Sequence, residues 1–154
     1  MKDESLAPLR YPNLSLIFHL SSFHFHLSIM SKGATLDKSK LFALRIIRFY
    51  SYLQKEKGEY VISKQLLRSG TSIGANARES NNAQSSADFV NKLSIALKEA
   101  DETAYWLELL YESDIIEQTH YDSLYSDLKE IIALLTASIK TSKQNQNQKI
   151  KLES

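Results

Sequence analysis

The sequence predicts an all-α protein, an up-and-down four-helix bundle. Both prolines lie within the first 12 residues and only 4 glycines occur, so the strongest helix breakers are nearly absent from the body of the chain. From about residue 37 onward, apolar residues recur at intervals of three and four, which is the period of a helix with one buried face. With 154 residues, 43% of them hydrophobic, the chain can form one domain with a core.

The first bundle helix is expected from about residue 37 to 57, ending near Gly58. Arg45, Arg48 and Lys55 fall outside its apolar stripe, so this helix presents a basic side to water or to a partner. The residues predicted to form the buried stripe are Ala43, Ile46, Ile47, Tyr50 and Leu53.

The second helix is expected from Ser63, whose hydroxyl can cap the first turn, to about residue 82. Gly70 and Gly74 lie four residues apart and form a flat strip with Ala77. A glycine inside a helix costs about 1 kcal/mol relative to alanine, so two of them indicate close packing against a neighbouring helix. A phosphate-binding loop is excluded because no Gly-Lys-Ser/Thr follows and no strand precedes.

The third helix is expected over residues 87–113, a segment without glycine or proline, with Ser86 as its cap. Tyr105 and Trp106 lie near its centre and are predicted to belong to the core or to a subunit interface. The fourth helix is expected from Thr119 to about residue 141. The stripe predicted for the third helix is Phe89, Leu93, Ala96, Ala100, Thr103, Leu107 and Leu110, and for the fourth Leu124, Leu128, Ile132, Leu135 and Ile139.

The ends of the chain differ in composition from the predicted bundle, which we place at residues 30–141. Residues 1–29 make a poor signal peptide, and the apolar run within them is short for a membrane span. We therefore interpret them as a misassigned leader that precedes a true start at Met30. The alternatives are a membrane anchor and a genuine extra segment of the protein. Residues 142–154 are polar and predicted to form a disordered tail. We expect a cytoplasmic protein that does not engage membranes.

Charge is segregated along the chain. Residues 32–80 carry ten basic and four acidic residues, residues 81–135 carry three basic and eleven acidic, and the formal net charge of the whole chain is only +1. Such an arrangement can neutralise itself within the fold, pair with a neighbouring copy, or leave a basic face for nucleic acid.

The residues indicate no catalytic centre, cofactor or metal site. Without cysteine, thiolate catalysis, disulfides and Cys-based metal sites are excluded. Glu117 and His120 form one Glu-x-x-His pair, whereas di-iron bundles use two such pairs and two further glutamates. His19, His24 and His26 lack an accompanying carboxylate. We therefore predict a protein that is not an enzyme.

Two segments carry a resemblance to a known family. They read SKQLLRSGTSIGAN over residues 63–76 and ALKEADET over residues 96–103, the latter followed by Tyr105-Trp106-Leu107. With Glu79, Ser86, Asp88-Phe89 and Lys92-Leu93 between and around them, they resemble the four helix bundle proteins, also called 23S rRNA-intervening sequence proteins, over about residues 38–143.

The resemblance implies an up-and-down bundle that assembles into a ring of five. Family members are encoded in insertions within large-subunit ribosomal RNA genes or elsewhere in bacterial genomes. A similar branch, the accessory protein of diversity-generating retroelements, binds nucleic acid as a basic ring. The present chain differs from that branch in its acidic second half.

We therefore predict a non-catalytic homo-oligomeric binding module that contacts RNA or DNA through basic residues of the first two helices. The alternative is a scaffold that binds protein partners and no nucleic acid. The residues predicted to bind nucleic acid are Arg45, Arg48, Lys55, Lys64, Arg68 and Arg78.

Overall fold

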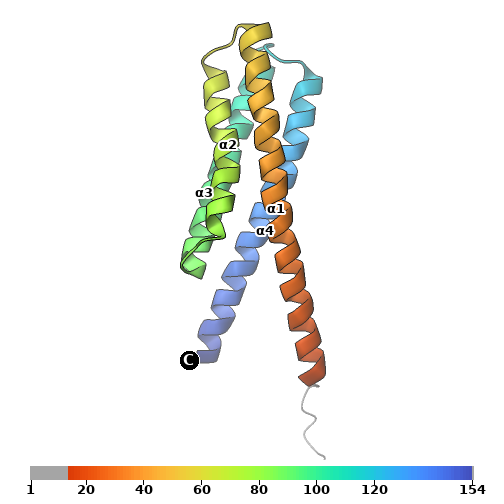
Figure 1. The fold of residues 1–154 in the computed structure, drawn as a ribbon, viewed down its shortest axis with the longest axis vertical. Coiled ribbons are helices and arrows are strands. Elements are labelled where there is room, and N and C mark those ends of the chain that lie inside the picture. The colour runs from red at the N-terminus through yellow and green to blue at the C-terminus, as the bar shows by residue number, and fades with distance from the viewer. Residues whose placement is uncertain (1–13, 154) are drawn as a thin grey trace, which may run out of the picture.

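Four helices in antiparallel succession make up the computed structural model, which describes the backbone of residues 14–153 and the side chains of residues 33–152. They are α1 (Leu14–Lys57), α2 (Ile62–Ser80), α3 (Ser86–Glu112) and α4 (Gln118–Glu153), shown in Figure 1. No strand occurs among the described residues. The predicted all-α four-helix fold is confirmed.

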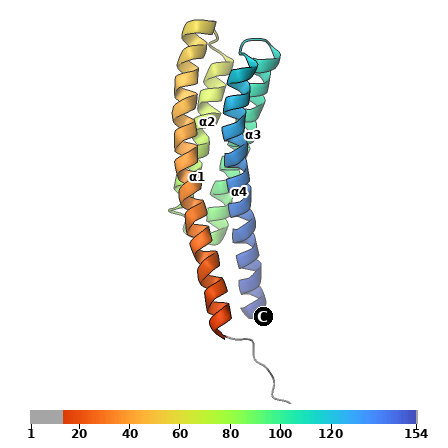
Figure 2. The same ribbon diagram turned by 90° about the vertical axis from the view of Figure 1, so that its right-hand side faces the viewer.

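The helices pack as a square. α1 packs against α2 and α4, and α3 packs against the same two helices, whereas the diagonal pairs make no close backbone approach. The seam between α1 and α4 therefore lies on the opposite side of the bundle from the seam between α2 and α3. Figures 1 and 2 show that one end of α1 and one end of α4 extend beyond the turn that joins α2 to α3.

The core is confirmed most completely in α3, where all seven residues of the predicted stripe are buried. In α4, Leu124, Leu128 and Leu135 are buried as expected, but Ile131 is fully buried and Ile132 only partly. The stripe predicted for α1 was wrong in part. The buried residues of this helix include Phe42, Ile46, Phe49 and Leu53, while Ile47 remains 45% exposed.

Two helices begin differently from the prediction. Glu59, and not Ser63, caps α2: its carboxylate accepts hydrogen bonds from the backbone N–H groups of Val61, Ile62 and Ser63 at 2.9, 2.8 and 2.6 Å. The Ser63 hydroxyl instead donates to the Glu59 carbonyl oxygen. A glutamate three residues before the first helical residue can place both carboxylate oxygens over the free N–H groups, which one hydroxyl cannot do.

The start of α3 is shifted by one residue from the prediction. Ser85, and not Ser86, is the cap, and its hydroxyl accepts a hydrogen bond from the Asp88 N–H at 3.1 Å. The Asp88 carboxylate in turn accepts from the backbone N–H of Gln84. This reciprocal pair satisfies two backbone donors at the helix end.

Two helices, α1 and α3, are followed by a residue with left-handed backbone conformation, and the first of these ends was predicted near Gly58. Gly58 follows the last residue of α1 with φ of 64°, a conformation that glycine adopts without steric cost. At the end of α3, Asp114 takes the same left-handed region with φ of 57°, and the N–H of Ile115 bonds back to the Leu110 carbonyl.

The termini depart from expectation. Residues 142–153, predicted to be a disordered tail, continue α4 as a helix. The segment contains no glycine or proline, and extending an existing helix requires only one residue to be fixed per hydrogen bond gained. Residues 14–29 likewise form the first part of α1, while residues 1–13 lie outside the described residues. Within the described residues, no helix combines the length and the apolar character needed to cross a membrane.

Candidate nucleic-acid interface

Ion pairs between helices absorb part of the segregated charge. Three of them join a basic residue of the first half to an acidic residue of the second half, and a fourth runs in the reverse direction. The first half of the chain therefore neutralises part of its charge against the second half within one molecule. The pairs are Lys38–Glu130, Arg45–Asp127, Arg68–Glu102 and Lys92–Glu79.

Arg45 belongs to the seam between α1 and α4. Its guanidinium pairs with the Asp127 carboxylate and donates to the Ser123 hydroxyl at 2.8 Å and the Ser123 carbonyl at 3.4 Å. Three hydrogen bonds hold the guanidinium plane against α4. Arg45 therefore joins α1 to α4, and its guanidinium is less free to contact a phosphate than the sequence suggested.

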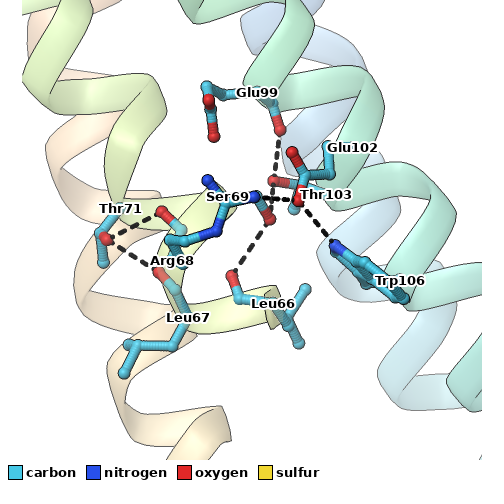
Figure 3. Close-up of polar contacts among 9 residues, drawn as sticks. All are labelled: Leu66, Leu67, Arg68, Ser69, Thr71, Glu99, Glu102, Thr103 and Trp106. Atoms are coloured by element: carbon cyan, nitrogen blue, oxygen red, sulfur yellow. Dashed lines mark hydrogen bonds and ion pairs between the residues drawn. The ribbon is translucent and has the colours of Figure 1, made fainter. Parts of the chain in front are cut away.

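Arg68 belongs to the opposite seam, between α2 and α3. Its guanidinium pairs with the Glu102 carboxylate, and the same oxygen of Glu102 accepts a hydrogen bond from the Trp106 indole N–H at 3.1 Å, as Figure 3 shows. The hydrogen bond from Trp106 and the charge of Arg68 lower the pKa of the Glu102 carboxyl. Trp106 packs partly buried against the core, whereas Tyr105 is 52% exposed with its ring centroid 5.0 Å from that of Trp106.

The small residues of α2 face α1. A Cβ atom on Gly70 would lie 3.0 Å from two side-chain carbons of Ile46, and one on Gly74 would lie 3.4 Å from the Ser39 carbonyl oxygen. Ala77, one turn further, is buried. The contact between α1 and α2 therefore runs along these small residues.

The other four predicted cations are exposed and have no ion-pair or hydrogen-bond partner among the described residues, but they do not share one face. Arg48 and Lys55 lie on α1, and Arg48 borders the seam with α4. Lys64 lies on α2 one turn before Arg68. Arg78 lines a groove between α1 and α2, together with Lys40. The predicted set is thus divided over three parts of the surface.

Arg48 lines an open cleft of about 540 Å³ between α1 and the first turns of α4. Three aromatic rings of the cleft, those of Phe49, Tyr52 and His120, form a cluster with centroids 5.1 to 5.7 Å apart. Arg45, Thr119, Ser123 and Leu124 complete its lining. We refer to this site as the α1–α4 cleft.

Sequence reasoning had not assigned a role to these aromatic residues. Tyr52 lies four residues after Arg48 and three after Phe49, a helical spacing that the sequence shows, but the partner residue His120 is about 70 residues away. His120 lies in the first turn of α4.

A second aromatic cluster lies between α3 and α4 in an acidic setting. The rings of Tyr111, Tyr121 and Tyr125 stack in succession, with centroids 4.8 and 5.1 Å apart. Burial raises the pKa of the Tyr121 phenol, and the negative charges of Tyr125, Glu108, Asp122 and Glu112 raise it further. These carboxylates disfavour an anion near Tyr121, while the ammonium of Lys129 lies over the Tyr125 ring, 5.4 Å from its centroid. We refer to it as the tyrosine ladder.

Among the described residues, no group of three or more His, Asp or Glu side chains is arranged to hold a metal ion. The α1–α4 cleft instead brings together two arginines, three aromatic rings and the hydroxyl-bearing residues Thr119 and Ser123. Such a combination is suited to binding a planar anion.

The fold and this surface define an all-α bundle with a basic, aromatic-lined cleft. The family model of the 23S rRNA-intervening sequence proteins matches residues 32–137, and the chain belongs to that family. It is similar to a protein of unknown function from the S23 ribosomal protein family of Bacteroides thetaiotaomicron VPI-5482, solved at 1.70 Å, with 55% identity and a TM-score of 0.71. The similarity covers 71% of this chain and 98% of that one. No curated protein matches the chain.

Proposed function

We propose that the protein is a non-catalytic, homo-oligomeric binding module of the cytoplasm that contacts RNA or DNA through Arg48 and Lys55 of α1. The observation that carries the proposal is that Arg48 stays exposed and unpaired beside the cleft, while its neighbour Arg45 is occupied by Asp127 and Ser123. A guanidinium without an acidic partner in its own chain is available to a phosphate.

The number of unpaired basic side chains per chain determines the affinity and the salt dependence of such binding. Two or three phosphate contacts per chain give a weak, salt-sensitive interaction, because each neutralised phosphate releases condensed counterions. Repetition of the contact in a ring of five, the assembly that the family resemblance implies, would raise the overall affinity through effective concentration. The proposal therefore joins oligomerisation to binding.

A charge-reversal experiment tests this proposal. Retention of a labelled single-stranded RNA by the full-length protein is measured at about 50 mM salt, where electrostatic contacts are strong. Changing Arg48 and Lys55 together to Glu should abolish retention and leave the circular dichroism spectrum and oligomer mass intact. Arg45 is left unchanged because its loss would also break the contact with Asp127.

Lys98→Glu combined with Lys140→Glu serves as the control, since it makes the same change in net charge at exposed positions of α3 and α4. Equal loss in both double variants would show that only net charge matters. Absence of RNA and DNA retention by the wild-type protein would rule the proposal out.

The alternative function, a scaffold that binds proteins and no nucleic acid, is favoured by a different observation. Leu41, Leu44 and Ile47 of α1 are 62%, 43% and 45% exposed. Neighbouring exposed apolar side chains indicate a protein contact surface. Replacing Leu44 with Glu should then disrupt the assembly, as measured by light scattering, and this outcome without any nucleic-acid retention would favour the scaffold.

A further inference from the structure

We propose that the α1–α4 cleft holds one unpaired nucleotide, with its base stacked on Tyr52 and His120 and its phosphate at Arg48. This inference rests on the proposed function and adds a selectivity to it: the protein would bind single strands and discriminate against duplexes. Size, aromatic lining and charge each support it.

The size and floor of the cleft fit a nucleotide. Its volume of about 540 Å³ falls within the range of small-molecule sites, roughly 300–1,000 Å³. Phe49 is buried at 8% exposure and forms the support, while the rings of Tyr52 and His120 are half-buried and offer surface to the cleft. Every base has a π face, so a ring platform of this kind accepts bases with little regard to sequence.

The rings hold one another in place. Tyr52 and His120 lie 5.1 Å apart with an angle of 32° between their planes, and Phe49 lies 5.7 Å from each. The Nδ1 atom of His120 is buried without a hydrogen-bond partner among the described residues. Aromatic packing, rather than a hydrogen bond at this nitrogen, therefore positions the imidazole.

Basic side chains lie beside the aromatic rings. Arg48 precedes Tyr52 by one helical turn, so both side chains project from the same side of α1. The ammonium of Lys57 approaches the Tyr52 ring to 5.9 Å from its centroid. Arg45, held by Asp127 and Ser123, forms a fixed wall of the cleft.

The selectivity follows from what a duplex exposes. In a duplex, both faces of each base are covered by neighbouring base pairs, so a base reaches an aromatic pocket only after unstacking and unpairing, which cost free energy. A single strand presents its base faces at little cost. A duplex would therefore contact this surface through phosphates alone.

The tyrosine ladder explains why the α1–α4 cleft, and not the other aromatic cluster, is the proposed site. Its rings are also stacked, but Glu108, Glu112 and Asp122 act on them with negative charge. A phosphate there would meet carboxylates. The ladder thus provides an internal control with similar ring chemistry in a setting that carries carboxylates, with Lys129 over the Tyr125 ring as its nearby cation.

Binding is tested by fluorescence anisotropy with the full-length protein, a labelled ten-nucleotide RNA, the same RNA in a duplex, and the corresponding single-stranded DNA, all at low salt. Tyr52→Leu removes the ring and keeps an apolar side chain. It should weaken single-strand binding by about 5- to 150-fold, the range that a lost base stack produces, and leave duplex binding unchanged. Tyr125→Leu in the tyrosine ladder should change neither.

A second measurement observes binding on the wild-type protein itself. Adding uridine or adenosine monophosphate to the wild-type protein should shift the His120 imidazole proton resonances, assigned by comparison with His120→Gln. Inorganic phosphate alone should not reproduce the shift, because it has no ring current. If single-stranded RNA and DNA bind with equal affinity, the protein recognises the base and the phosphate. A higher affinity for RNA would indicate an additional contact to the 2′-hydroxyl.

The inference is overturned if Tyr52→Leu leaves single-strand binding unchanged, if duplex binds as tightly as single strand, or if polyglutamate displaces RNA as well as unlabelled RNA does. In these cases loss of binding in the Arg48→Glu, Lys55→Glu protein would still support the proposed function through phosphate contacts. If the wild-type protein binds no nucleic acid at all, both proposals fail.

Discussion

Gly70 of α2 lies directly against Ile46 of α1: a Cβ atom at the glycine would be 3.0 Å from both Cγ1 and Cγ2 of the isoleucine. Real Cβ atoms rarely approach other atoms so closely, and Ile46 is fully buried and cannot move away into solvent. At Gly74 the nearest atom, the Ser39 carbonyl oxygen, is 3.4 Å away, which is ordinary contact. The two glycines therefore differ in what they tolerate.

Gly70→Ala should destabilise the protein by about 1–3 kcal/mol, because overpacking outweighs the gain in helix propensity. Gly74→Ala should be neutral or stabilise by up to about 1 kcal/mol, since the propensity gain meets no clash. Urea unfolding followed by circular dichroism measures both. A larger replacement, Gly74→Leu, should still overpack the contact.

A double-mutant cycle checks the mechanism. Ile46→Ala removes the two carbons that Gly70→Ala would meet, so the two substitutions together should cost less than the sum of their separate effects. Additive costs would show that Gly70 is required for a reason other than this contact.

Glu59→Gln should destabilise the protein by about 1 kcal/mol at neutral pH, because the charged cap of α2 becomes a neutral one. Burial acts to raise the pKa of the Glu59 carboxyl, but the hydrogen bonds from Ile62, Ser63 and Val61 outweigh it and lower the pKa. The folded state thus favours the ionised form.

The sign of the pH dependence follows from this lowered pKa. The stabilisation by Glu59 is fully present above the pKa of an unfolded glutamate, about 4.3, and is lost as pH falls through the lower folded pKa. The difference in unfolding free energy between wild type and Glu59→Gln should therefore shrink below about pH 4. A difference independent of pH would mean that the carboxylate charge does not act as the cap.

The buried face of a helix could be predicted where the local sequence pattern was unambiguous. In α3 the seven residues of the stripe recur at alternating intervals of four and three without a break, so they could be identified. In α1 two apolar stripes lie side by side, one with Phe42 and Phe49 and the other with Leu44 and Ile47. Which one is buried depends on where α2 and α4 lie, and periodicity alone does not contain that information.

The candidate site was harder to predict than the fold because its pairs are distant in sequence. Arg45 meets Asp127 and Arg68 meets Glu102, at separations of 82 and 34 residues. A charge pattern along one helix predicts only neighbours three or four residues apart. The predicted basic face therefore contained residues that the fold uses to join helices.

Ser69 and Thr103 form a buried polar contact between α2 and α3. The Thr103 hydroxyl lies 2.9 Å from the Ser69 hydroxyl and 2.7 Å from the Glu99 carbonyl (Figure 3). Thr103→Val should cost about 1–3 kcal/mol, because it removes the hydroxyl that Ser69 faces and leaves a buried polar group with fewer partners.

Replacing both residues, Ser69→Ala with Thr103→Val, should cost less than Thr103→Val and Ser69→Ala added together, since the contact between the two hydroxyls can be lost only once. Chemical denaturation of the four proteins measures the coupling. Strict additivity would indicate that the two hydroxyls act independently of each other.

Tyr121→Phe should make the protein more resistant to alkaline unfolding. Burial of the Tyr121 phenol, followed by the negative charges of Tyr125, Glu108, Asp122 and Glu112, raises its pKa above the ordinary value of 10.0. The folded state then holds the phenolic proton longer than the unfolded chain, so unfolding releases a proton as pH rises above about 10, and wild-type stability falls until the folded pKa is reached. Phenylalanine cannot ionise, so the variant avoids this loss of stability.

The measurement is the free energy of unfolding in urea at several pH values between about 8 and 11. Plotted against pH, the free energies of wild type and variant should run parallel at the lower end and diverge above about pH 10, with the variant the more stable. Other titrating groups, among them Lys129 near Tyr125, are common to both proteins and cancel in the comparison. Curves that stay parallel throughout would show that Tyr121 ionises as readily in the bundle as in the unfolded chain.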